Sequence, residues 1–399
     1  LSMAVMVRYS SAAKGIIMRY LISFIKKETV LCIAILLALC SAFFVHPDRA
    51  YLDYIDVRTL AILFCLMAVV AGLGGIGLFD WLAGWLLSRA KKVWQVLMLL
   101  VMLCFWFGML ITNDVAVVTF VPFAMIVLKQ IKCEHLLVPV VVLQTIGANL
   151  GSMMTPVGNP QNLYLYGLAG FGVGAFVRLM LPYAGLALFL LIICVAMVAL
   201  RENRRHPKGG TLADKGVAVS AEESRIASRG KLLAYLALFV VCLLSVVRLI
   251  SWEAVLELVI IACLVMDKKV LLRVDYSLLG TFVGFFVFVG NLGRVDVFRD
   301  FLAKMIEGRE VLTAILSSQL MSNVPAALLL SGFTEHIDRL IIGVNLGGLG
   351  TLIASMASLI SYKYVARRDA AKRGGYMLCF SLLGLVFLAF ELVLYACIG

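Results

Sequence analysis

Residues 94–128 read WQVLMLLVMLCFWFGMLITNDVAVVTFVPFAMIVL, and the fold class follows from how this stretch is interrupted. A helix needs about 20 apolar residues to cross a hydrocarbon core of about 30 Å, so the stretch is long enough for a membrane helix. The polar cluster Thr112-Asn113-Asp114 divides it in the middle. A second apolar stretch, residues 311–333, is divided by Ser322-Asn323-Val324-Pro325. We interpret both stretches as re-entrant hairpins, which enter and leave the membrane on one side with the polar tip near mid-membrane.

The composition of the whole chain indicates that lipid, not water, is its main solvent. Hydrophobic residues make up 63% of the 399 residues and charged residues only 15%, whereas soluble domains carry about 25% charged residues. Long apolar runs favour helices over a transmembrane barrel, whose strands would alternate. We predict an all-α polytopic membrane protein with crossing helices at residues 29–46, 57–78, 136–165, 179–200, 232–250, 252–267, 275–292, 337–363 and 376–397.

The net charge of +12 is carried by basic residues that lie between the apolar runs. This spacing is typical of topology control, because cytoplasmic loops collect Lys and Arg, and it argues against a nucleic-acid partner. If both hairpins are re-entrant, most of the 35 basic residues fall on one side. We therefore predict a multi-pass protein of the lipid bilayer, in the plasma (inner) membrane of a bacterium. The predicted cytoplasmic segments are residues 1–28, 79–93, 129–135, 201–231, 267–273 and 363–375.

Two similar halves follow each other in the chain. The stretch that begins at Asp56 aligns without gaps with the stretch that begins at Asp275, and both continue into an amphipathic segment, a hairpin, a broken helix and a final helix. One additional helix between the halves would turn the second copy upside down. Inverted repeats of this kind are typical of secondary transporters. The predicted parts are an N-terminal cytoplasmic segment (1–28), a first repeat (29–200, hairpin 94–128), a cytoplasmic linker (201–231), a connecting helix (232–250) and a second repeat (251–399, hairpin 311–333).

A broken helix is expected after each hairpin. Residues 155–160 read Thr-Pro-Val-Gly-Asn-Pro, and residues 345–351 read Asn-Leu-Gly-Gly-Leu-Gly-Thr. Pro and Gly interrupt a helix and free backbone groups, which then present a partly positive helix N-terminus to an anion and carbonyl oxygens to a cation. The alternative is that these small residues only permit close helix packing.

Three carboxylates lie in apolar surroundings. Asp114 is the only charged residue between Lys92 and Lys129. An intramembrane carboxylate is expensive, so Asp114 is a candidate cation ligand or proton carrier; the alternative is an N-cap of the second hairpin arm. Glu257 and Glu391 lie near predicted helix ends, from which they could reach the lipid headgroups.

The sequence offers no catalytic set. It contains neither a Ser-His-Asp arrangement nor an HExxH motif that would favour a membrane enzyme. The ten cysteines are never spaced as CxxC, and the four histidines fall in or near predicted loops. We expect no enzyme activity, no metal centre and no cofactor, with sodium as a candidate coupling ion.

At the two interrupted stretches the chain resembles the ion transporter superfamily, which includes divalent-anion:sodium symporters, citrate transporters, arsenite permeases and sodium/proton antiporters. The resemblance extends from about residue 29 to 397. It implies a homodimer with an elevator motion and a small anionic solute bound between the tips. The solute-binding residues it implies are Thr112, Asn113, Thr155, Pro156, Asn159, Ser322, Asn323, Val324 and Thr351; the implied cation-coupling residues are Asn113, Asp114, Gly158, Asn323 and Gly350.

Two positions depart from the symporter pattern. Asp114 stands where the symporters have threonine, and Asn113-Asp114 is more similar to the arsenite permeases. Val324 removes a hydroxyl from the second tip. The function predicted is secondary active transport of a small anion (dicarboxylate, citrate or inorganic oxyanion) coupled to sodium or protons. The alternatives are arsenite or antimonite efflux, sodium/proton antiport, or an ion channel, against which the paired hairpins argue.

Overall fold

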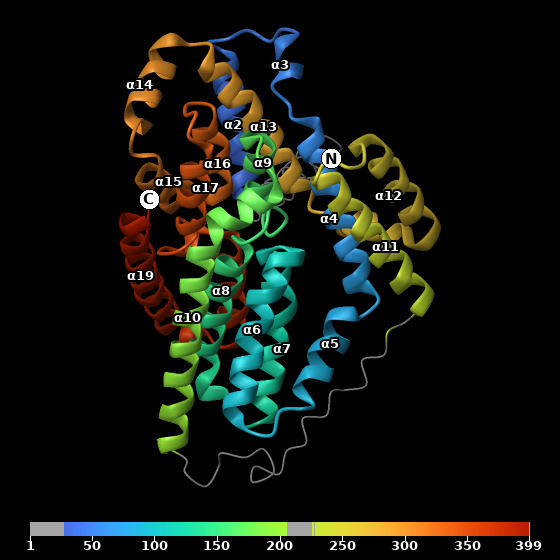
Figure 1. Ribbon diagram of the computed structural model, residues 1–399, viewed down its shortest axis with the longest axis vertical. Helices are drawn as coiled ribbons and strands as arrows, with labels where there is room; N and C mark the ends of the chain where they lie inside the picture. The colour runs from blue at the N-terminus through green and yellow to red at the C-terminus, as the bar shows by residue number, and fades with distance from the viewer. Residues whose placement is uncertain (1–27, 206–225, 227, 399) are drawn as a thin grey trace, which may run out of the picture. The chain divides into compact units, whose positions relative to one another are not determined.

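The computed structural model describes residues 28–205, 226 and 228–398, and every regular element in these ranges is a helix (Figure 1). Most of the predicted N-terminal segment and the middle of the predicted linker lie outside the described residues. The first half consists of α2 (Thr29–Ala42), α3 (Ala50–Asp53), α4 (Val57–Gly75), α5 (Leu78–Leu87), α6 (Val93–Ile111), α7 (Asn113–Gln130), η1 (Glu134–Leu136), α8 (Leu137–Ser152), α9 (Pro160–Ala169) and α10 (Val173–Arg205).

The second half repeats this order. Each half contains an amphipathic helix (α5, α14), a helix pair joined by one residue (α6/α7, α15/α16), a broken helix (α8/α9, α17/α18) and a final long helix (α10, α19). The helix α11 (Arg229–Val246) precedes the second half, which consists of α12 (Trp252–Asp267), η2 (Lys268–Arg273), α13 (Tyr276–Gly293), α14 (Asp296–Ile306), α15 (Glu310–Met321), α16 (Asn323–Ser331), α17 (Ile337–Leu346), η3 (Leu352–Ala354), α18 (Met356–Arg368), η4 (Ala370–Lys372) and α19 (Arg373–Ile398).

Eight helices in the described part of the chain are long and apolar enough to cross a membrane, which confirms the prediction of an all-α polytopic protein. The two predicted hairpins differ in length. The arms α6 and α7 have 19 and 18 residues, whereas α15 and α16 have 12 and 9. Each arm of the first pair could span a bilayer by length alone, so its re-entrant topology stays a prediction.

The chain divides into two compact units. One contains α2, α3, α13 and the beginning of α14; the other contains the remaining helices. In the first unit, helix α2 of the first half packs against α13 of the second half, and in the second unit, α12 of the second half packs against α4 of the first. The first long helix of each half therefore packs against the second long helix of the other half.

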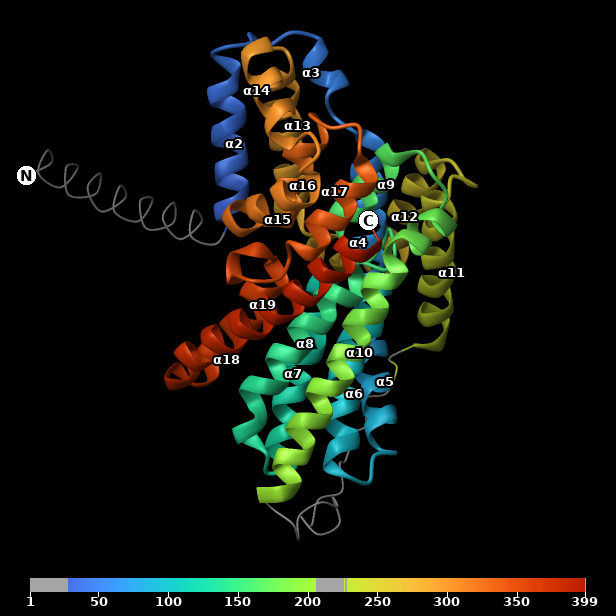
Figure 2. The ribbon, with the colours of Figure 1, turned by 60° about the vertical axis from the view of Figure 1, so that its left-hand side comes forward.

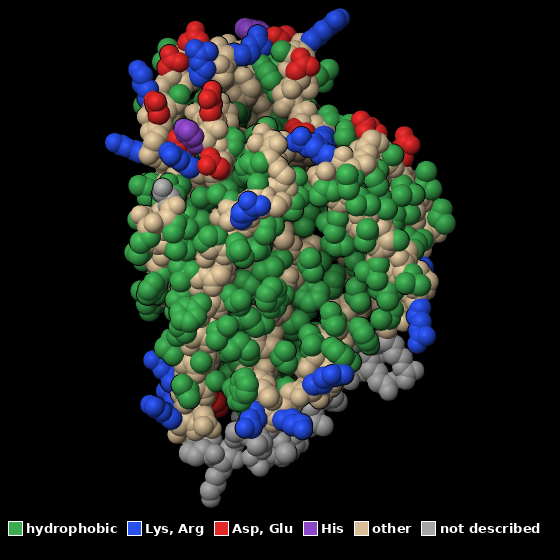
Figure 3. Space-filling view, viewed as in Figure 1, with side chains coloured by type: hydrophobic (Ala, Val, Ile, Leu, Met, Phe, Trp, Pro, Cys, Tyr) green, Lys and Arg blue, Asp and Glu red, His purple; other side chains and the backbone are tan. Residues whose placement is uncertain are grey.

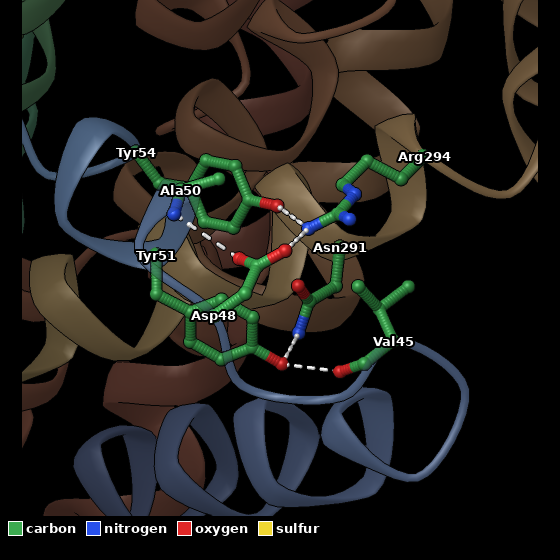
Figure 4. A network of polar contacts seen from close by, with 7 residues as sticks. All are labelled: Val45, Asp48, Ala50, Tyr51, Tyr54, Asn291 and Arg294. Atoms are coloured by element: carbon green, nitrogen blue, oxygen red, sulfur yellow. Dashed lines mark hydrogen bonds and ion pairs between the residues drawn. The ribbon is translucent and has the colours of Figure 1, made fainter.

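A polar network closes the turn between α2 and α3 in the first unit (Figure 4). Asn291 of α13 donates from Nδ2 to Ser41 Oγ (2.9 Å) and to Tyr51 Oη (2.8 Å). Arg294 donates to Tyr54 Oη (3.1 Å) and to Asp48 Oδ2 (2.8 Å). Hydrogen bonds to Tyr54 and Asp48 raise the pKa of the Arg294 guanidinium above its ordinary value. The hydrogen bonds of Asn291 and Arg294 therefore connect this turn to the C-terminal end of α13.

The second unit has the surface of a lipid-embedded bundle. Helices α6, α7, α8 and α10 lie side by side in both ribbon views (Figure 1, Figure 2). Hydrophobic side chains cover these helices on the face shown in Figure 3, and Lys and Arg gather near their lower ends. Trp106 and Phe189 are 51% and 60% exposed. Because a soluble monomer rarely exposes large contiguous apolar patches, this surface indicates contact with lipid.

Helices α6 and α8 pack extensively against each other, and their close approach depends on a glycine. A Cβ atom on Gly151 of α8 would lie 2.1 Å from the carbonyl oxygen of Phe105 in α6. Small residues let membrane helices approach until their backbones touch. Gly147 lies one turn earlier on α8, also facing α6, so the two glycines form a GxxxG contact surface.

We expect Gly151→Ala to lower the stability of the purified protein by about 1–3 kcal/mol, because the added methyl must push α6 away from α8. The matched control is Gly185→Ala in α10, where an added Cβ meets nothing within 4 Å. Thermal unfolding in detergent measures both. A Gly151→Ala variant as stable as the Gly185→Ala variant would contradict the close approach of the two helices.

Candidate functional site

The two helix-pair tips share an unusual backbone conformation. Thr112 has φ 79° and ψ 149°, and Ser322 has φ 76° and ψ 155°. This region is occupied almost only by glycine, and a residue with a side chain pays about 1–3 kcal/mol to adopt it. Both tips therefore hold a hydroxyl residue in the same strained conformation. Strain of this kind persists only where the surroundings fix it, and it is concentrated at binding sites.

The first tip is fixed by the break in the helix α8/α9. The backbone N–H of Asn113 donates to Gly158 O (3.1 Å), and Thr155 Oγ1 donates to Met109 O. A Cβ atom on Gly158 would lie 2.0 Å from the carbonyl oxygen of Ser152, so only glycine fits this turn of the unwound segment. Asn113 is 4% exposed. The N-terminus of α7 at Asn113 thus lies beside the N-terminus of α9, which begins at Pro160.

The second tip is fixed in the same way by the break in the helix α17/α18. Ser322 Oγ donates to Ala354 O (3.4 Å), next to Ser355, which is the N-cap residue of α18. Gln319, one turn before the tip, donates to Gly347 O and Leu349 O (2.9 Å each) and accepts from the Thr351 N–H (2.9 Å). The unwound segment is therefore held by the hairpin arm α15, and the N-termini of α16 and α18 lie close together.

Two asparagines connect the halves reciprocally. Asn149 of α8 accepts from Asn113 Nδ2 (3.0 Å) and from Ser355 Oγ (2.8 Å), and donates to Ser358 Oγ (3.2 Å). Hydrogen bonds through Asn149 and the Ala354–Ser355 segment therefore join the first tip to the second. In the opposite direction, Asn345 of α17 contacts the first half.

Asn345 Oδ1 accepts from Asn159 Nδ2 (3.1 Å), and Asn345 Nδ2 donates to Asn162 Oδ1 (2.6 Å). Asn159 is the N-cap of α9, where its Oδ1 accepts from the Asn162 N–H (2.9 Å). All three asparagines are buried. Helix α7 also packs against α18, and α16 packs against α9. The second arm of each hairpin therefore contacts the second part of the broken helix in the other half.

Most of the residues predicted for the site lie in this network, and some do not. Thr112, Asn113, Thr155, Gly158 and Asn159 meet around the first tip, whereas Ser322, Asn323, Val324 and Gly350 belong to the second tip and its unwound segment. Pro156 is buried in the first unwound segment, and Thr351 is exposed. Asp114 is half-buried and is not the N-cap of α7; Thr112 takes that position, and Asp114 lies in the first turn.

Three polar residues that the structure places here received no specific role from the sequence. Asn149 and Gln319 hold the tips, and Gln161 is 1% exposed with neither its Oε1 nor its Nε2 hydrogen-bonded within the described residues. A buried amide without partners costs about 1–3 kcal/mol, so Gln161 is a group that a bound solute could satisfy. The available signal was a polar side chain inside an otherwise apolar helix.

The arrangement can bind ions through neutral groups. It offers amide donors and the N-termini of four helices to an anion, and amide and carbonyl oxygens to a hard cation. Asp114, at the first tip, adds one carboxylate. Within the described ranges no group of three or more His, Cys, Asp or Glu side chains could hold a metal ion.

In comparisons with known proteins, the chain is similar to transporters and other membrane proteins. A sequence model described as citrate transporter matches residues 16–339. The inner membrane protein YbiR of Escherichia coli is 30% identical over 336 residues, which cover 82% of this chain and 86% of that protein. An uncharacterised transporter of Methanocaldococcus jannaschii is 28% identical over 320 residues (80% and 84%). The 46 kDa membrane protein of Mycobacterium leprae is 23% identical over 345 residues (77% and 78%).

We expect Asn149→Ala and Ser355→Ala to be coupled, because their side chains share the hydrogen bond that joins the halves. A double-mutant cycle on unfolding should give an interaction energy of about 0.5–3 kcal/mol. The control cycle combines Asn149→Ala with Ser331→Ala, whose hydroxyl contacts Tyr164 instead, and should be additive. Additivity of the first pair would contradict the connection between the tips.

Proposed function

The chain belongs to the citrate transporter family, and we propose that it is a secondary active transporter that moves a small anion of the dicarboxylate, citrate or inorganic oxyanion class, coupled to sodium or protons. The family match and the Methanocaldococcus jannaschii relative that is named as a transporter confirm the resemblance predicted from the interrupted helices. They also support a multi-pass integral membrane protein that carries a small solute.

The observation that carries the proposal is the pairing of helix N-termini at both tips. Each helix N-terminus bears roughly half a positive charge, so four of them form a site that favours negative charge without a Lys or Arg side chain. Asn113 and Asn323 are buried at the first residues of α7 and α16, where their amides can bind a solute between the tips. Thr112 and Ser322 add hydroxyls, and Thr155, Pro156, Asn159 and Thr351 line the unwound segments in the proposal.

The cation would bind on the carbonyl side of the same breaks. Gly158 and Gly350 lie in the unwound segments, whose carbonyl oxygens are the ligands that sodium prefers, and Asp114 supplies charge beside them. A cation there would compensate the anion, since moving an uncompensated charge through apolar surroundings is costly. Val324 carries no hydroxyl at the second tip, which favours a solute with fewer oxygens to satisfy than citrate has.

The repeat supports an alternating-access mechanism. The order of elements occurs twice. Helix α7 packs on α18 in the same way as its counterpart α16 packs on α9, the counterpart of α18, and this reciprocity is expected for two halves related by a two-fold axis. We extend the proposal to a homodimer whose transport domains move by an elevator motion. An ion channel would need a continuous pore instead, and non-saturating flux would distinguish it.

A second candidate function follows from Asp114. A carboxylate beside Asn113 at the first tip also suits two other functions. One is arsenite or antimonite efflux; the other is sodium/proton antiport, in which the transported solute is itself a cation. Efflux against a gradient without anion uptake would favour this alternative.

We expect Asn113→Ala and Asn323→Ala each to lower anion uptake into proteoliposomes at least tenfold, because each removes a buried amide that corresponds to more than about 1.4 kcal/mol of binding. Asn203→Ala, at an exposed position of α10, is the control and should transport normally. Gel filtration checks that the variants stay folded. Normal uptake by both tip variants would place the solute elsewhere.

We expect Asp114→Asn to allow exchange of solute between the two sides but to lose accumulation against a gradient, because it keeps the side-chain shape and removes the charge that couples the cation. Counterflow and net uptake in the same proteoliposomes measure the two activities. Asp80→Asn in the amphipathic helix α5, where the side chain is exposed, is the control. Full accumulation by Asp114→Asn would reduce Asp114 to a favourable charge at the start of α7.

A further inference from the structure

Glu391 lies on the buried face of the last helix. The buried residues of α19 recur every three or four positions, which places them on one face. They are Tyr376, Phe380, Gly384, Phe387, Leu388 and Glu391. Glu391 is 0% exposed, so the expectation that it reaches the headgroups is wrong, because it continues this packed stripe. Glu257 of α12, the other glutamate with that expectation, is exposed.

The carboxyl of Glu391 has no partner to stabilise a charge. Neither of its oxygens is hydrogen-bonded within the described residues. An ionised carboxylate in an apolar environment without a counter-charge is far more costly than the neutral acid. The surroundings of Glu391 therefore favour the form that carries a proton.

The groups that face Glu391 are uncharged phenols. Tyr183 of α10 interacts electrostatically with Glu391 and with Tyr395, and Tyr395 lies one helical turn after Glu391 on α19. Of the other elements packed on α19, α8 and η3 contain no charged residue. The charged residues of α18, η4 and α10 are Lys363, Arg367, Arg368, Lys372, Arg178, Arg201, Glu202, Arg204 and Arg205.

The charges of α18, η4 and the C-terminal end of α10 lie away from Glu391. Ser361 of α18 contacts Tyr376 at 2.6 Å, so α18 and η4 lie near the start of α19, about 22 Å along the helix from Glu391. Cys194 of α10 lies near Cys379, which places the charged end of α10 at the start of α19 as well. Arg178 is exposed, outside the stripe that carries Tyr183.

The buried face links Glu391 to the second unwound segment. Gly384 lies two turns earlier on the same face, and a Cβ atom there would be 2.9 Å from the backbone nitrogen of Gly350. Glu391 is thus about 10 Å along α19 from the segment that Gln319 holds beside the second tip. Charging Glu391 requires water or a counter-ion at this interface, and either would loosen α19 from that segment.

We propose that Glu391 is a proton-binding site of the transport cycle, separate from the hairpin tips. A proton from water forms the O–H bond of the carboxylic acid while the face is open, and the closed, packed face holds the neutral acid. One coupling ion is then a proton, and its site is in the final helix, apart from the cation proposed beside Asp114. This inference rests on the proposed function, because it assigns a driving ion of that same transport.

Infrared spectroscopy tests the proton directly. At neutral pH the protein in lipid should show the carbonyl stretch of a protonated carboxylic acid, absent in Glu391→Gln and unchanged in the control Glu257→Gln. Glutamine resembles the neutral acid, so Glu391→Gln should fold. If it does not, Glu391→Asp assigns the band, because this variant keeps a carboxylic acid and shifts its carbonyl stretch. A band that persists unchanged in Glu391→Gln and Glu391→Asp would overturn the proposal.

Transport tests the coupling with labelled citrate, succinate and phosphate. An imposed gradient of one pH unit can drive about a tenfold accumulation through one coupled proton. Wild type and Glu257→Gln should reach this with the anion they carry, whereas Glu391→Gln should exchange the anion without accumulating it. Accumulation by Glu391→Gln equal to wild type, or transport by wild type that does not respond to the pH gradient, would overturn the inference. If wild type moves no anion, the proposed function fails, and the infrared result still decides whether Glu391 holds a proton.

Discussion

Interrupted helices in an apolar medium must satisfy their own freed backbone groups, and the organisation of the second unit depends on this constraint. Water is absent from a hydrocarbon core, so each unsatisfied N–H or C=O costs several kcal/mol. The unwound segment 347–355 meets this demand through Gln319, whose single amide serves three backbone groups. The first unwound segment is served by Asn113 and Asn162. Each hairpin tip therefore lies beside an unwound segment. The polar residues cluster there because the two interruptions supply hydrogen-bond partners to each other's backbone groups.

The strained tips follow from the same arrangement. A glycine would adopt the backbone angles of Thr112 and Ser322 at lower cost, yet hydroxyl residues stand at both. Ser322 donates its hydroxyl to Ala354 O in the unwound segment of its own half, a bond that glycine could not make. The energy of the tip conformation is thus offset by contacts that exist only when the tip lies against the break. The backbone conformation of each tip is therefore determined by its contacts with the unwound segment rather than by the conformational preference of Thr112 or Ser322.

Much of this could be predicted from the sequence, because apolar runs, prolines and glycines are local signals. The interruptions at Thr112 and Ser322 were predicted at the residues where the helices end, and the broken helices likewise. What local signals cannot specify is which residue serves which break. Asn149 and Gln319 lie inside regular helices, and their roles depend on partners far away in the chain, among them Ser355 and Gly347. Glu391 was misplaced for the same reason: its distance from the helix end suggested headgroups, whereas its position on the packed stripe of α19 determines its burial.

The chemistry of the site is consistent with a protein that must release what it binds. Lys or Arg at the tips would bind an anion strongly and retain it in apolar surroundings, whereas helix N-termini and amides offer partial charges whose strength depends on the position of the solute. A site of partial charges needs a compensating cation for the loaded protein to be neutral. Asp114 and Glu391 are both carboxyl groups that can bind a cation or a proton, but their surroundings differ: Asp114 is half-buried at a helix N-terminus, which stabilises a charge, and Glu391 is buried without a hydrogen-bond partner within the described residues, which stabilises the protonated form. Two carboxylates in such different environments have opposite preferences, so the protein can keep a negative charge at the tip while the final helix stays neutral.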